Sequence, residues 1–117
     1  MAERVTTNFD YAVGQGDVFL SVAIGEGQAG TSEVKLGTTQ LVVASGAIGN
    51  LRIGAGPELK GKTLTIKSAV NDVSTMTNRM SVTYRLTGGT AANEVSAKGQ
   101  VDAEGKMLVF MTTVALS

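Results

Sequence analysis

The chain has 117 residues with ten basic and ten acidic side chains, and it contains no histidine, cysteine or tryptophan. This length fits one domain with its own hydrophobic core. The balanced charge argues against nucleic-acid binding, which needs a basic excess or stripe to neutralise phosphates. Without cysteine or histidine the chain forms no disulfide and offers no zinc, copper or haem site of the usual kind.

Residues 1–16 are polar, with Phe9, Tyr11 and Val13 at a spacing of two. This pattern predicts a weak strand or an ordered amino-terminal arm. Such a strand pairs either with its own sheet, which is the commoner outcome, or with that of a neighbouring molecule. The first clear strand follows at Asp17–Ile24, where apolar residues alternate and predict one buried face.

Residues 25–30 read Gly-Glu-Gly-Gln-Ala-Gly and match the G-x-G-x-x-G pattern of dinucleotide-binding loops. That function requires a crossover helix directly after the loop, with its amino terminus at the pyrophosphate. Here Thr31–Leu36 alternates like a short strand and ends at Gly37. We therefore interpret residues 25–30 as the loop of a hairpin.

The middle of the chain continues the pattern of short strands and turns. A strand is expected at Thr39–Ala44, where the apolar run at residues 41–43 predicts burial on both faces. A broken strand follows at Ala47–Ile53. Gly54–Pro57 is expected to be a loop, and Gly56–Lys60 allows one helical turn at most. Lys62–Val70 then alternates apolar and polar residues.

The last third of the chain predicts a three-stranded antiparallel meander. Met80–Leu86 alternates strictly, and a second strand with Val95, Ala97 and Val101 on one face follows the break at residues 88–90. Residues 102–105 (Asp-Ala-Glu-Gly) form the next turn, and the final strand begins at Lys106.

Together these elements predict an all-β fold, an antiparallel two-sheet sandwich of Greek-key, jelly-roll or immunoglobulin-like type with about seven to nine short strands. The chain is expected to be a single domain over residues 1–117, with residues 1–16 as a candidate amino-terminal arm.

The final strand is apolar on both sides. Met107, Val109 and Met111 share one parity, and Leu108 and Phe110 share the other. A half-exposed strand should alternate, so this strand is either a central core strand or one that another subunit covers. With Phe9 and Tyr11, the three odd-numbered residues are the candidate interface.

The sequence offers few residues that could form a catalytic or metal-binding site. No side chain titrates near neutrality without histidine, and no nucleophile signature occurs, so we expect no enzymatic activity, cofactor or metal centre. The loops at residues 25–30, 54–57 and 71–78 are candidate ligand rims. Their candidate contact residues are Glu26, Asn71, Asp72 and Asn78, although one loop carboxylate is little charge for calcium.

No run approaches the ~18 apolar residues of a membrane helix, and no signal peptide is visible. If Met1 is the native start, the default expectation is a soluble cytoplasmic protein; export without a cleaved signal would look the same. The leading functional hypothesis is a structural or protein-interaction module that self-associates or docks on a larger assembly. The alternative is a small-ligand or carbohydrate-binding module, calcium-assisted or not.

Overall fold

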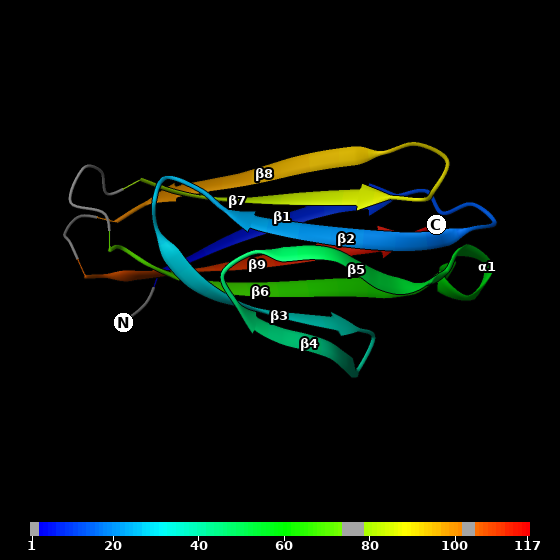
Figure 1. Ribbon diagram of the computed structural model, residues 1–117, viewed down its shortest axis with the longest axis horizontal. Coiled ribbons are helices and arrows are strands. Elements are labelled where there is room, and N and C mark those ends of the chain that lie inside the picture. The colour runs from blue at the N-terminus through cyan, green and yellow to red at the C-terminus, as the bar shows by residue number, and fades with distance from the viewer. Residues whose placement is uncertain (1–2, 74–78, 102–104) are drawn as a thin grey trace.

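The computed structural model describes residues 3–73, 79–101 and 105–117, which form nine strands and one short helix (Figure 1). In chain order the elements are β1 (Glu3–Tyr11), β2 (Asp17–Ile24), β3 (Ala29–Leu36), β4 (Thr39–Ser45), β5 (Ile48–Ala55), α1 (Gly56–Leu59), β6 (Thr63–Asn71), β7 (Arg79–Thr87), β8 (Asn93–Gln100) and β9 (Met107–Leu116). The predicted all-β two-sheet sandwich is confirmed. The ends of β2 to β8 differ from the predicted ones by at most two residues, whereas β1 ends at Tyr11, inside the predicted arm of residues 1–16.

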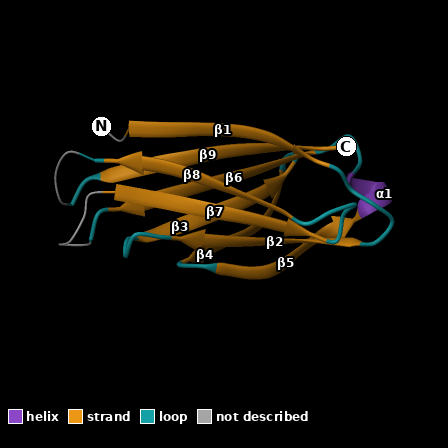
Figure 2. Cartoon of the chain, turned by 90° about the horizontal axis from the view of Figure 1, so that it is seen from above, coloured by secondary structure: helices purple, strands orange, loops and turns teal. Residues whose placement is uncertain are grey.

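The strands form two sheets that pack face to face (Figure 2). Sheet A has the order β1-β9-β6-β3-β4, and sheet B has the order β5-β2-β7-β8. Sheet A is mixed rather than purely antiparallel, because β1 runs parallel to β9 from Glu3 beside Leu108 to Tyr11 beside Leu116. After β1 the chain enters sheet B instead of turning back along β9, so no hairpin fixes the two strands as antiparallel.

The predicted carboxyl-terminal meander is wrong in its last strand. β7 and β8 do form an antiparallel hairpin in sheet B, but β9 crosses to sheet A and lies between β1 and β6. The inner face of β8 carries only small or half-buried residues such as Ala97 and Gly99, which suits an edge strand. β9 instead buries Leu108, Phe110 and Val114, which suits its position between β1 and β6 inside sheet A.

The core lies between the sheets and is built from the alternating residues that the sequence predicts. β2 and β7 show this most plainly, with burial at every second position. Each fully buried aliphatic or aromatic side chain contributes about 1.5–3 kcal/mol relative to exposure. The largest fully buried side chains are Tyr84, Phe110, Leu20, Leu59, Leu64, Ile66, Met80, Leu86 and Leu108.

A small polar cluster interrupts this core. Ser32 and Ser68, on β3 and β6, share a hydrogen bond of 2.7 Å between their hydroxyls, and Thr112 on β9 is equally buried. Within the described residues, the hydroxyls of Tyr84 and Thr112 have no hydrogen-bond partner of good geometry. Burial raises the pKa of Tyr84, and the nearby hydroxyls of Thr112 and Ser68 partly oppose that shift.

The end of the sandwich beside α1 is held by close backbone contacts. The N–H of Gly56 donates to the carbonyl of Gly16 at 2.9 Å, and the N–H of Gly89 donates to the hydroxyl of Tyr11, also at 2.9 Å. A side chain at Gly56 would meet the backbone of Gly14. The connections β1–β2, β5–α1 and β7–β8 are therefore packed together at this end.

Candidate interaction surface

The outer face of β9 is apolar over residues 107–111, and no second sheet of the described chain covers it. Its inner residues pack against sheet B, whereas Met107 is 39% exposed and Val109 and Met111 are half-buried on the opposite side. Sheet B covers only one side of sheet A, so β9 is not buried on both faces within this chain. Burial of the other face by another subunit stays a prediction. We call Met107, Val109 and Met111 the β9 strip.

The register of sheet A defines the borders of the β9 strip. Val109 lies between Arg4 of β1 and Ala69 of β6. Met111 lies between Thr6 and Lys67, and Lys67 in turn lies beside Glu33 of β3. The strip is therefore a narrow apolar row with cationic side chains at its border.

The two aromatic residues of the predicted interface lie elsewhere. Phe9 and Tyr11 are on the inner face of β1, where Phe9 packs against the core and Tyr11 is only 3% exposed. β1 thus pairs with the chain's own sheet, the commoner of the two outcomes expected. A signal was present in the sequence, since the intervening residues Asn8 and Asp10 are polar and place the aromatics on the inner face.

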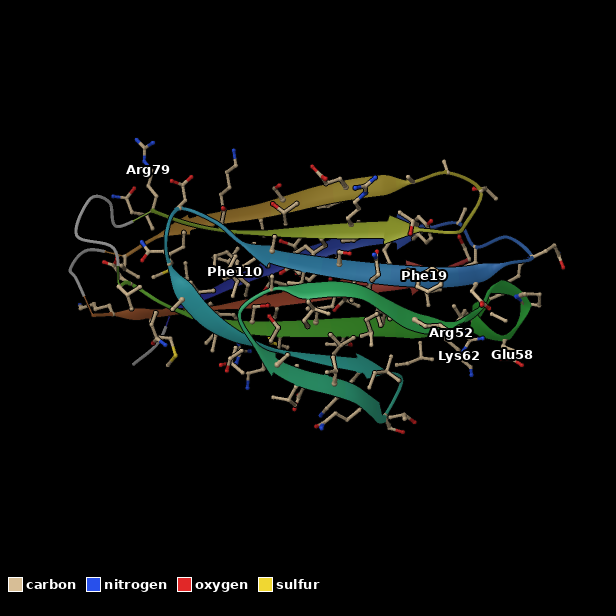
Figure 3. All side chains as sticks on the ribbon, in the orientation of Figure 1. Phe19, Arg52, Glu58, Lys62, Arg79 and Phe110 are labelled. Atoms are coloured by element: carbon tan, nitrogen blue, oxygen red, sulfur yellow. The ribbon has the colours of Figure 1, made fainter. Side chains whose placement is uncertain are left out.

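Two of the three predicted ligand loops meet at one end of the sandwich. The side chain of Gln28, which is buried, donates from Nε2 to the carbonyl of Arg79 at 2.9 Å. Its Oε1 accepts a hydrogen bond from the N–H of Val73 at 2.8 Å. The third predicted loop, residues 54–57, is not a loop, because these residues end β5 and begin α1. They lie at the opposite end of the sandwich, so the three segments do not form one rim (Figure 1). Figure 3 shows Arg79 at one end and Arg52, Glu58 and Lys62 at the other.

Glu26 lies on the rim of an open hollow of about 430 Å³. Its backbone adopts a left-handed conformation with φ of 61°, and its side chain is exposed. The hollow has mixed charge and is lined by Glu26, Arg79, Met80, Lys98, Gly99 and Gln100. Such a shallow, mixed surface offers contact but little enclosure for a small molecule.

The other predicted ligand-loop residues are not brought together by the structure. Asn71 is exposed at the end of β6, whereas Asp72 is only 3% exposed. Both carboxylate oxygens of Asp72 lack a hydrogen-bond partner among the described residues. Its main chain is fixed, since its N–H donates to the carbonyl of Lys106 at 2.9 Å and its carbonyl accepts from the N–H of Gly105 at 3.0 Å. Asn78 and residues 102–104 of the predicted turn lie outside the described residues.

Residues 3–73, 79–101 and 105–117 hold no group of three or more acidic side chains that could bind a metal ion. In the same part of the chain, no helix has the length and apolar character needed to span a bilayer. Comparisons with protein-family models, with curated proteins and with solved structures find no match for this chain.

A further exposed apolar residue lies on β4. Val43 of β4 is 51% exposed, although the apolar run at residues 41–43 predicted burial on both faces. That prediction is wrong because β4 is the edge of sheet A and its outer face has no second layer. The absence of charge throughout Thr39–Ser45 was the available sign of an unusual edge.

Proposed function

We propose that this chain is a non-enzymatic structural module that associates with other protein surfaces through the β9 strip, a second copy of itself being the first candidate partner. The observation that carries the proposal is the apolar outer face of a central strand, with Met107 39% exposed. The sequence also lacks the histidine and cysteine side chains on which most catalytic and metal sites depend.

The physical argument rests on what the outer face of a two-sheet sandwich normally shows. Such a face alternates with the core and is polar, as Thr65 and Lys67 of the neighbouring β6 are. Valine and methionine at Val109 and Met111 gain little stability in an isolated molecule, because water still reaches them. They gain it when a partner covers them, and the flexible methionine side chain adapts to the contour of that partner.

The proposal is tested by light scattering coupled to size-exclusion chromatography over a wide range of protein concentration. We expect the wild-type chain to self-associate and the substitution Val109→Lys to weaken that association. Thr113→Lys is the matched control, because Thr113 lies four residues further along the same strand, on the same face and equally half-buried. If the wild type assembles and the Val109→Lys variant assembles as well as the Thr113→Lys variant, the β9 strip is not the contact surface.

A ligand-binding module is the second candidate function. The observation that favours it is the buried carboxylate of Asp72, whose two oxygens have no hydrogen-bond partner among the described residues. A buried carboxylate is costly unless it is paired or bound to a cation. A calcium-dependent rise in melting temperature that Asp72→Asn abolishes would support this function, and no rise would contradict its calcium-assisted form.

A further inference from the structure

The strand β4 is an open edge of sheet A. In the part of the chain that the structure describes, β4 pairs with β3 alone and lies at the margin of sheet A (Figure 1). An open edge presents unpaired main-chain N–H and C=O groups along its length. These groups are a template for one further strand.

The other three sheet edges each expose at least one charged side chain, whereas β4 has none. β1 exposes Arg4 and Asp10, and β8 exposes Glu94 and Lys98. β5 exposes Arg52 and has two irregularities in its register. The strand Thr39–Ser45 (TQLVVAS) has no charged residue and no proline. Charge, proline and irregularity are the devices by which proteins block edge pairing, and only the bulge described next remains here.

The usable part of this edge is Val42–Ser45. One irregularity, at Leu41, shifts the pairing of β4 with β3, and beyond it the pairs run regularly from Val42 beside Val34 to Ser45 beside Thr31. Val43 points outward and is 51% exposed, while Val42 and Ala44 point inward and are half-buried. The regular segment thus offers a β-branched residue on its outer face and two small or β-branched residues on its inner face.

We propose that β4 pairs with β4 of a second copy of this chain, antiparallel and about a two-fold axis at Val43. This register pairs Val43 with its own equivalent on the outer face and Val42 with Ala44 of the other copy on the inner face. The two residues of each pair then point to the same face of the sheet, as antiparallel pairing requires. A two-fold axis makes the contact self-complementary and closed.

Electrostatics permit this self-pairing. The nearest charged neighbour of Val43 is Glu33, which lies beside it on β3 and pairs with Lys35 at 3.5 Å. In the proposed dimer the two Glu33 residues are separated by three strand spacings, or roughly 14 Å, which exceeds the screening length at physiological salt. A neutral strand therefore meets a neutral strand, and no like charges are placed opposite each other.

The inference rests on the proposed self-association and names a second surface for it, so its test must separate β4 from the β9 strip. The variants V43K and V43E each place like charges directly opposite each other in the proposed dimer. We expect each variant alone to weaken dimerisation by about tenfold or more. An equimolar mixture of V43K and V43E should restore the dimer, because unlike charges then face each other. V73K is the matched control, since Val73 is an exposed valine outside the strands.

Sedimentation velocity over a concentration series distinguishes the outcomes. Loss of the dimer in V43K and V43E, recovery in their mixture and no change in V73K support the inference. Assembly of V43K equal to that of the wild type overturns the inference, and the proposed function is then judged by Val109→Lys alone. A wild type that stays monomeric at every concentration overturns the inference together with self-association.

Discussion

Replacing Gly56 by alanine should reveal how tightly the end of the sandwich is packed. Gly56 is buried at the start of α1, and its N–H donates to the carbonyl of Gly16 at 2.9 Å. An added Cβ would lie 2.7 Å from the carbonyl carbon of Gly14 and 3.2 Å from its nitrogen. These are main-chain atoms and cannot rotate aside, so the β1–β2 connection must move away from α1.

The size of the effect follows from three contributions. Overpacking of this kind costs about 1–3 kcal/mol. Weakening the hydrogen bond from Gly56 to Gly16 adds about 1 kcal/mol. Alanine regains about 1 kcal/mol through its higher helix propensity and the smaller entropy of the unfolded chain. The net expectation for Gly56→Ala is a loss of about 1–3 kcal/mol, with a fall in melting temperature of roughly 4 °C per kcal/mol.

Gly49→Ala is the matched control for Gly56→Ala. Gly49 lies in β5, its φ is not positive, and a Cβ there would meet no atom within 4 Å. We expect this variant to be unchanged or more stable by about 0.5 kcal/mol. Urea unfolding monitored by circular dichroism gives both free energies. If the Gly56→Ala and Gly49→Ala variants have equal free energies of unfolding, Gly56 does not approach Gly14 closely.

Two further predictions concern buried polar groups. Gln28→Ala removes both hydrogen bonds between the loops and should cost about 1–3 kcal/mol, with faster hydrogen exchange at the Val73 amide; unchanged exchange there would contradict the bridge. Burial raises the pKa of Tyr84 in the folded state above the ordinary tyrosine value of 10.0. The folded state therefore favours the neutral phenol more strongly than the unfolded state does. The resulting contribution to the unfolding free energy is complete below the pKa of the unfolded state and is lost as pH rises through the pKa of the folded state. Tyr84→Phe should therefore lose less unfolding free energy than the wild type when alkaline titration passes pH 10.0, and parallel losses would contradict the assignment.

The faces of single strands could be predicted from the sequence, because side-chain alternation is a local property of the chain. β6 illustrates this, with Leu64 and Ile66 inside and Thr65 and Lys67 outside, as expected. The partner of a strand is not local. Nothing within residues 107–111 indicates that β9 leaves the β7–β8 hairpin, because the choice depends on the inner faces of distant strands.

The same limit applies to the candidate interaction surface. An apolar residue at Val43 or Val109 has the same local sequence signal whether the neighbouring space is filled by a second sheet or by solvent. Only the layer arrangement shows that both valines lie on the outer side of sheet A. Polar residues carry a clearer signal, yet Ser68 is buried in a strand whose other inner residues are apolar, and only its hydrogen bond to Ser32 explains it.

The distribution of polarity across sheet A supports a role in association. The inner face holds the buried hydroxyl groups of Ser32, Ser68 and Thr112, whereas the outer face of the central strand holds Val109 and Met111. A buried hydroxyl is tolerated when it is hydrogen-bonded, as Ser32 and Ser68 are to each other at 2.7 Å. A half-buried valine or methionine on the outer face adds little stability to the isolated molecule. A partner that covers the β9 strip removes this apolar surface from water and accounts for its placement, which is why the first experiment belongs on that face.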